Sequence, residues 1–272
     1  MPGAIFTLVE HPESGEQTLA AARHLASLMG FNKIEVLAIQ GPAEMAMMPA
    51  GNVAAPAQAN DAGCTERDCI QKLHRQFDAW AAETKIPGLK VQWNEIKGLP
   101  DTLIGEWGRR SDFVVLNRQV RCNRVSDRLA MQAALFDTDR PVLIASPGKI
   151  ANFGENVVIA WRNDKRTERA VLSALPLLKR ANSVHIVAGR RSGAQPVQSP
   201  AFLAANGISA QMHILPVGMG NFGKTLLNAA HEIGADLLVM GAYTHNPWRE
   251  LILGGVTSTM IAQSDLPILM RH

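Results

Sequence analysis

The sequence predicts an α/β protein made of two tandem, doubly wound, parallel five-stranded domains related by pseudo-two-fold symmetry. Three observations lead to this fold class. The 272 residues exceed what one ordinary domain needs, which favours two domains of similar size. Short apolar segments alternate with Ala- and Leu-rich helical segments, as in parallel sheets whose strands are joined by helices. A pattern in the first half of the chain also recurs in the second half.

The repeat is clearest at the end of each half. "SDFVVLN" at 111–117 and "ADLLVMG" at 235–241 share an acidic residue followed by a short apolar run. Each is followed by a strand-like segment with a proline near its start, at 140–146 and at 266–272. The two halves therefore end alike.

Each half also begins alike. An apolar strand is predicted at 4–10 and at 156–161, and a second strand at 33–39 and at 183–189. A helical segment separates the two strands in each half. The strands are continuously apolar rather than alternating, which indicates that helices cover both faces of the sheet.

Two segments lack periodicity: one marks the domain boundary and the other an inserted loop. The stretch 146–156 is rich in Gly, Pro and Asn, so we expect domains at 1–148 and 153–272. Residues 41–64 are rich in small side chains and predict a loop inserted in the first domain, ahead of a helix at 65–85.

Composition argues against several classes of protein. The net charge of +3 comes without a long basic stripe, which argues against nucleic-acid binding. No apolar run reaches the roughly 20 residues of a membrane helix, and the chain starts without the basic residues of a signal peptide. Three sparse cysteines suit a reducing cytoplasm. No metal site is expected, because Cys64, Cys69 and His74 point in different directions on a helix.

The sequence "GMGNFGKT" at 218–225 matches the phosphate-binding P-loop, which would imply an ATP-hydrolysing enzyme acting through Lys224. Three arguments favour an ordinary helix start. Asp112 and Asp236 fall at strand starts, so they cannot hold Mg²⁺ at the carboxyl ends of the strands. The third strand is expected at the sheet edge, which places 218–225 away from the ligand crevice of an open sheet. The corresponding stretch of the first half, 95–108, opens a helix without any phosphate pattern.

A second glycine-rich segment is the better phosphate candidate. A strand is expected to end at Gly241, and Gly254-Gly255-Val256-Thr257 then opens a helix. Glycine lets backbone amides approach an anion, and the positive end of the helix dipole favours negative charge. Thr257 adds a hydroxyl donor, while His245 and Arg249 offer positive charge to a phosphate.

This segment resembles a known family. The spacing of Gly241, Thr244 and Gly254-Gly255, together with "RELILGG", is similar to the glycine signature of universal stress proteins, in particular bacterial members with two domains in one chain. The segment 160–181 resembles the first strand and helix of the second domain in those proteins. The resemblance covers essentially the whole chain and is strongest over 156–272.

The resemblance implies a fold like that of the adenine nucleotide α-hydrolases, and ATP or AMP, with Mg²⁺, bound beside the glycine segment. Carried over residue by residue, it implies nucleotide contacts near the adenine from Ala160, Trp161 and Val187. It implies contacts at the phosphates from Gly241, His245, Arg249, Gly254, Gly255 and Thr257.

The sequence also departs from the family pattern. Thr244 replaces a loop glycine, and Arg162 stands where an acidic or amide residue is expected, unless Asn163 or Asp164 substitutes. No glycine lies between Gly108 and Gly148. We therefore expect any nucleotide in the second domain.

The resemblance implies a cytoplasmic stress-response protein that binds and signals, with ATP or AMP in the second domain. Two alternatives stay open: an interaction module without a ligand, and an enzyme that hydrolyses ATP at 218–225 or slowly at 241–257. No catalytic residue is assigned. The expected partners are the second domain of the same chain and protein partners that the sequence does not name, and a homodimer stays open.

Overall fold

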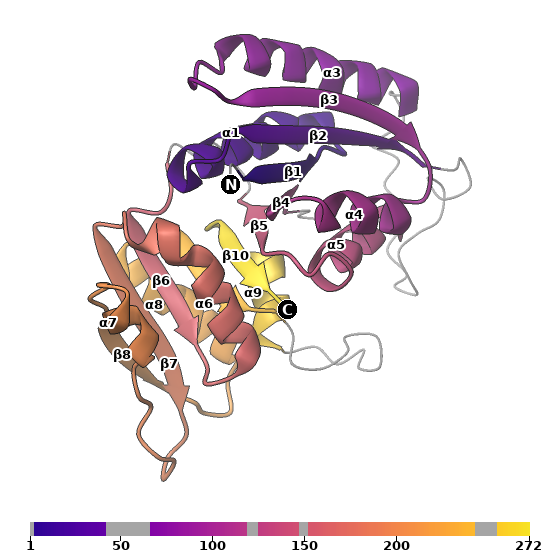
Figure 1. Cartoon of the computed structure of the whole chain (residues 1–272). Coiled ribbons are helices and arrows are strands. Elements are labelled where there is room, and N and C mark those ends of the chain that lie inside the picture. The colour runs from indigo at the N-terminus through magenta and orange to yellow at the C-terminus, as the bar shows by residue number, and fades with distance from the viewer. Residues whose placement is uncertain (1–2, 42–65, 119–124, 147–151, 243–254) are drawn as a thin grey trace. The chain divides into compact units, whose positions relative to one another are not determined.

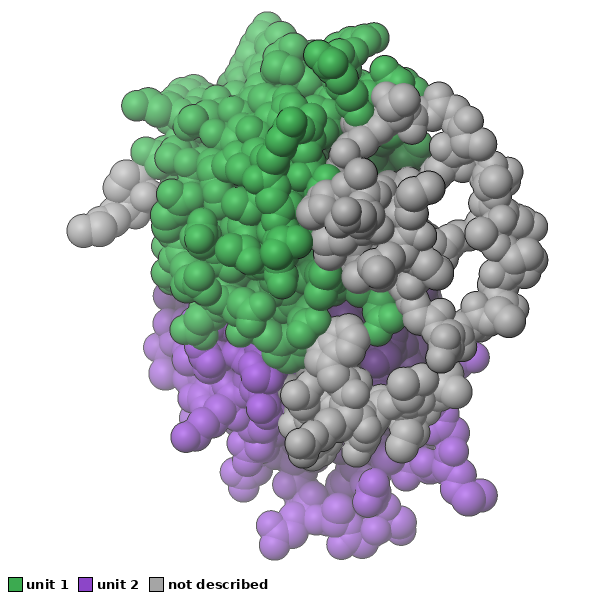
Figure 2. Space-filling model, turned by 90° about the vertical axis from the view of Figure 1, so that its right-hand side faces the viewer, with its two compact units in different colours: residues 1–140 green, residues 141–272 purple. Residues whose placement is uncertain are grey.

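The computed structural model describes residues 3–41, 66–118, 125–146, 152–242 and 255–272. The chain forms two compact units, Met1–Arg140 and Pro141–His272, which Figure 2 shows in green and purple. Strands and helices alternate along both units (Figure 1). The predicted α/β fold with a mostly parallel sheet is confirmed. None of the described helices is both long and apolar enough to cross a membrane.

The first unit contains a four-stranded parallel sheet with the order β3-β2-β1-β4. Helix α1 packs against α3 and helix α4 packs against α5, so helices cover both faces (Figure 1). The strands are β1 (Ala4–Leu8), β2 (Lys33–Gln40), β3 (Lys90–Lys97) and β4 (Phe113–Asn117). The helices are α1 (Pro12–Met29), α3 (Glu66–Glu83), α4 (Pro100–Arg109) and α5 (Val125–Phe136). The loop predicted at 41–64 lies, apart from residue 41, outside the described residues.

The second unit repeats this order as β8-β7-β6-β9 and adds β10 and β5 beyond β9. Helices α6 and α7 lie on one face and α8 and α9 on the other (Figure 1). The strands are β5 (Val142–Ala145), β6 (Asn156–Trp161), β7 (Ser183–Arg190), β8 (Gln211–Pro216), β9 (Leu237–Gly241) and β10 (Ile268–Arg271). The helices are α6 (Lys165–Leu178), α7 (Ala201–Ala205), α8 (Phe222–Ile233) and α9 (Val256–Gln263).

Strand β5 departs from the all-parallel expectation. It pairs antiparallel with β10, with Ile144 opposite Ile268, and belongs to the second unit. The expected domains, 1–148 and 153–272, instead place β5 in the first. Local sequence patterns predict that a strand exists, but they do not say with which distant strand it pairs.

The inner strands are buried on both faces, as their apolar runs predict. The first four of the five residues of β4 are buried, and β5 is buried throughout. The edge strands β3 and β8 differ, because exposed residues recur at every second position for much of their length. An edge strand has one neighbour and fewer covering helices, so a continuous apolar run is not required there.

The repeated acidic residues have the same structural role in both units. Asp236 Oδ1 accepts a hydrogen bond from Gly154 N at 2.8 Å, and its Oδ2 accepts from Glu155 N and Asn156 N at 2.9 and 3.0 Å. In the first unit Asp112 Oδ2 accepts from Ala4 N at 2.8 Å. Both aspartates lie directly before their own strands, at the amino end of the sheet, as the sequence predicted. Each carboxylate also fixes the start of the first strand of its repeat, which the sequence did not indicate.

We predict that Asp236→Ala lowers the free energy of unfolding by about 2–4 kcal/mol, because three backbone amides lose a charged acceptor. The matched variant Asp112→Ala loses one such bond, so its expected cost is about 1–2 kcal/mol. Urea unfolding of both variants checks this. Equal losses, or no loss in Asp236→Ala, would contradict the role assigned to the repeat.

Candidate functional site

A cavity of about 1140 Å³ lies in the second unit, where the strands of its sheet end. Its walls come from the carboxyl ends of β6, β7 and β9, from the residue after β8, and from the first turns of α6, α8 and α9. Residues 191–200, between β7 and α7, supply another wall. Ligands of open α/β sheets bind at this edge, outside the carboxyl ends of the strands.

Strand register brings the walls together. Ala160 of β6 pairs with Val187 of β7 on one side and with Met240 of β9 on the other. Because the three strands are parallel, the residues that follow them emerge at the same edge. The cavity is therefore a direct consequence of the β6 pairings.

Six of the nine predicted contact residues line this one cavity: Ala160, Trp161, Val187, Gly241, Gly255 and Thr257. The other three, His245, Arg249 and Gly254, lie outside the described residues, as does Thr244. The structure thus brings together residues that the sequence separates by almost a hundred positions. Their contact with a nucleotide stays a prediction.

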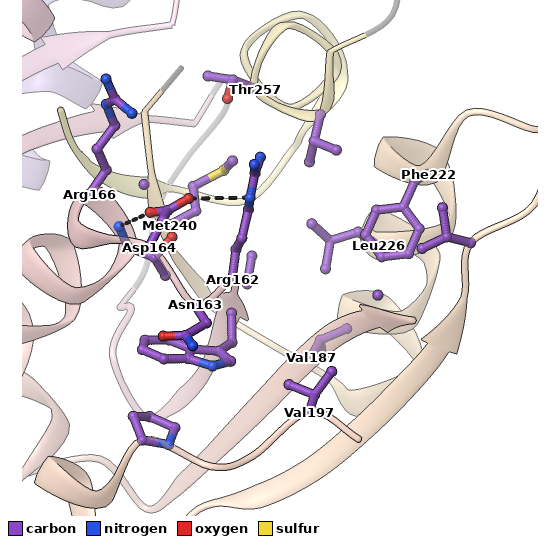
Figure 3. Close-up of a pocket in the computed structure, with 18 of the residues that line it drawn as sticks. Arg162, Asn163, Asp164, Arg166, Val187, Val197, Phe222, Leu226, Met240 and Thr257 are labelled. Carbon is purple, nitrogen blue, oxygen red and sulfur yellow. Dashed lines mark hydrogen bonds and ion pairs between the residues drawn. The ribbon is translucent and has the colours of Figure 1, made fainter. Parts of the chain in front are cut away.

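One side of the cavity is apolar. Val187 and Leu226 are 2% and 1% exposed, and Phe222 and Val197 lie beside them. Figure 3 shows Val187, Val197, Phe222 and Leu226 together on one side of the cavity. This side suits a flat, uncharged group, because burying it against aliphatic and aromatic side chains removes apolar surface from water.

The opposite side is polar and charged. Arg162 Nε lies 3.3 Å from Asp164 Oδ2, and the end of the Arg162 side chain points toward the start of α9, where Thr257 lies (Figure 3). Arg166 adds a second guanidinium group to the lining, and Arg191 adds a third from the segment that follows β7. The cavity is therefore amphipathic, since an apolar side is combined with three arginine side chains.

Three helices begin at the cavity, and their first turns differ. Asp164 caps α6 by accepting a hydrogen bond from Thr167 N at 2.8 Å. Asn221 caps α8, since its Oδ1 accepts from Gly223 N at 2.9 Å and from Lys224 N at 3.4 Å. Helix α9 begins after Gly255, which has no side chain to cap it. Of the three helices that begin at this edge, α9 is therefore the one whose first turn has no side-chain cap within the described structure.

Two histidine pKa values bear on the charge near the cavity. Burial lowers the pKa of His185, two residues before Val187, and the neighbouring His213 lowers it further. Burial also lowers the pKa of His272, and the positive charges of Arg166 and Arg169 add to this effect. Both shifts favour the neutral imidazoles at neutral pH. Neither histidine lines the cavity, and the positive charge of its described lining comes from arginines.

Gly241 has a packing role that the sequence did not indicate. A Cβ at this position would lie 2.8 Å from Thr167 N and 3.1 Å from Arg166 C. The end of β9 therefore contacts the backbone of the first turn of α6, which only glycine allows. This close approach helps to set the width of the cavity.

The P-loop-like segment 218–225 forms a helix start, as the sequence favoured. Asn221 already occupies the amides of Gly223 and Lys224. A Cβ on Gly223 would lie 2.7 Å from Thr259 Cβ, so this glycine allows α8 to approach α9. Gly218 and Gly220 have no atom within 4 Å of an added Cβ. Helix packing therefore accounts for Gly223, whereas Gly218 and Gly220 are open to solvent.

One expectation about this segment is wrong. We expected 218–225 to lie away from the ligand crevice, yet Phe222 lines the cavity. Strand β8 is at the sheet edge as predicted, but α8 returns over the face of β7. A Cβ on Gly189 would lie 2.7 Å from Phe222 Cζ, which shows how closely the helix start contacts that strand.

Sequence reasoning missed part of the lining. Val197 and Arg191 lie in a segment without helical or strand periodicity, so no pattern places it against the cavity. Phe222 also lines the cavity, but the glycine pattern around it does not mark it as a lining residue. Their position in the chain could have indicated them, because both segments directly follow strands whose ends meet at this edge.

Comparison with known proteins agrees with this description. Residues 206–272 match the model of the Universal stress protein family, so the predicted resemblance is confirmed there. No curated protein sequence matches the chain.

Solved structures extend the likeness in fold to the whole chain. A universal stress protein from Archaeoglobus fulgidus DSM 4304 is 16% identical, with a TM-score of 0.68 over 98% of this chain and 95% of that chain. A functionally unknown protein from Pseudomonas aeruginosa PAO1 is 13% identical, with a TM-score of 0.60 over 99% and 92%. A universal stress protein in complex with cAMP is 18% identical over 43% of this chain and 95% of that chain, with a TM-score of 0.32.

We predict that Gly223→Ala lowers the free energy of unfolding by about 1–3 kcal/mol, because α8 and α9 must separate to admit the methyl group. Gly220→Ala is the matched control, where open space predicts a change of less than about 1 kcal/mol. Urea unfolding distinguishes the two variants. A loss in Gly220→Ala as large as that in Gly223→Ala would contradict the packing role.

Proposed function

We propose that the universal stress protein domain matched at 206–272 belongs to a unit that binds an adenine nucleotide, ATP or AMP, and signals its occupancy in a stress response. The observation that carries the proposal is the amphipathic cavity at the carboxyl ends of β6, β7 and β9. Its volume of about 1140 Å³ is ample for a nucleotide.

The apolar wall fits the base. Adenine is flat and aromatic, and the aliphatic side chains of Val187, Val197 and Leu226 offer it a dry surface. Ala160 lies on the same sheet face as its pairing partner Val187, and its small side chain leaves room there. The base is therefore proposed on the side where the resemblance also expects it.

The start of α9 fits a phosphate. Its first backbone amides have no intrahelical acceptor, and no side-chain cap occupies them in the described structure. Gly255, Thr257 and Ser258 all line the cavity at this point. An anion here gains hydrogen bonds from the amides and the favourable end of the helix dipole.

We propose that the unit binds the nucleotide without rapidly hydrolysing it. A hydrolase needs a group that activates or positions water. The described lining contains a single carboxylate, that of Asp164, and no histidine. Both Asp164 oxygens already have partners, Thr167 N and Arg162 Nε.

Titration calorimetry with ATP, AMP and cAMP in the presence of Mg²⁺ tests the proposal. We expect the wild type to bind an adenine nucleotide and Ser258→Asp to weaken binding by at least about tenfold, because a carboxylate at the start of α9 repels phosphate. Both Lys224→Ala and Thr225→Asp, at the first turn of α8, should bind like the wild type, since neither residue lines the cavity.

The variants separate the alternatives. Loss of binding in Lys224→Ala or Thr225→Asp, with Ser258→Asp unaffected, would place the nucleotide at the P-loop-like segment instead. Absence of binding by the wild type would favour an interaction module without a nucleotide.

A further inference from the structure

We infer that the cavity holds its nucleotide as the metal-free anion, through arginine side chains, and that Mg²⁺ is not required for binding. This inference rests on the proposed nucleotide site and deepens it. It differs from the sequence expectation, in which ATP or AMP came with Mg²⁺.

The charges of the lining are unbalanced in favour of an anion. Arg162, Arg166 and Arg191 line the cavity, whereas Asp164 is the one carboxylate among its described residues. Guanidinium groups bind phosphate oxygens through paired, charge-assisted hydrogen bonds and stay charged at any physiological pH. The walls themselves therefore provide the positive charge that Mg²⁺ provides in many nucleotide sites.

The position of Arg162 is central to the inference. It follows directly after β6, so the central strand of the unit fixes its backbone. Its Nε contacts Asp164 at 3.3 Å, while the end of the side chain extends between the start of α9 and the apolar wall (Figure 3). A phosphate at α9 therefore lies within reach of this guanidinium. The Arg162 side chain is 67% exposed, so a ligand can approach it without rearranging the core.

The described lining offers little to a divalent cation. Mg²⁺ prefers carboxylate oxygens and water. Asp164 Oδ1 accepts from Thr167 N at 2.8 Å, and its Oδ2 faces Arg162. Nowhere in the described parts of the chain do three or more His, Cys, Asp or Glu residues gather in a way that could hold a metal ion. A cation brought in with ATP would also lie close to the arginines and be repelled by them.

The inference predicts how affinity depends on ligand charge. Without metal, each added phosphate brings negative charge to the arginines of the lining, so affinity should rise from AMP to ADP to ATP. Mg²⁺ neutralises part of that charge, so it should leave ATP affinity unchanged or weaken it. Added salt should weaken binding by screening the same attraction.

The experiment is calorimetric titration of the full-length chain with AMP, ADP and ATP, first in EDTA and then with excess Mg²⁺. We expect ATP to bind in EDTA with an affinity at least equal to that in Mg²⁺. Arg162→Ala should weaken ATP binding in EDTA by about tenfold. Lys165→Ala is the matched control, because it removes one exposed positive charge from the start of α6 without touching the cavity.

A second matched pair of variants tests the arginines independently of position 162, in case Arg162→Ala weakens binding by disturbing the fold. Arg191→Ala should also weaken ATP binding, whereas Arg190→Ala, its neighbour outside the lining, should not. Binding that disappears in EDTA and returns with Mg²⁺ would overturn the inference while leaving the proposed function intact. Equal losses in Arg190→Ala and Arg191→Ala would overturn the role of the arginines that line the cavity. Absence of nucleotide binding under both conditions would overturn the proposed function itself.

Discussion

The site depends on one constraint, the parallel pairing of β6 with both β7 and β9. Ala160 is the residue at which the two pairings meet, because it is opposite Val187 and Met240 at once. This register brings the ends of three strands, and the helices that follow them, to one edge of the sheet. A shift of either pairing by one residue would turn the apolar wall of the cavity to the opposite face of its strand.

The three helices that begin at this edge differ in their N-terminal caps, and only an uncapped start leaves its backbone amides available to a ligand. Asp164 and Asn221 occupy the first amides of α6 and α8. Gly255 has no side chain that could cap α9, so the segment with the less complete sequence motif is the better anion site. A letter-for-letter P-loop match is therefore less informative than the identity of the residue that precedes the helix.

The sequence predicted more of the fold than of the site. Continuous apolar runs identified the inner strands, and the paired Asp112 and Asp236 revealed the repeat, because both follow from local periodicity. The antiparallel pairing of β5 with β10 was not predictable, since it joins segments more than a hundred residues apart. Six residues that line the cavity were predicted through the family resemblance. Arg191 and Val197 were missed, because an irregular segment has no periodicity that reveals what it packs against.

The first and second units share a fold but differ in the residues that follow their strands. Both have the same order of their first four strands, and both use an aspartate to fix the first one. The sequence after β4 of the first unit has no counterpart of Gly254-Gly255, as the absence of glycine between residues 108 and 148 shows. Fold alone therefore does not assign a ligand to both halves. The residues that follow each strand decide whether a ligand can bind there.

We propose that a nucleotide binds between the β6–β7–β9 edge and the start of α9. Methionine methyl NMR tests it directly, since Met240 is 4% exposed and lines the cavity, whereas Met219 is fully exposed within the P-loop-like segment. On titration with ATP, we expect a saturable shift of the Met240 methyl signal and little change at Met219. A shift at Met219 with Met240 unchanged would contradict it.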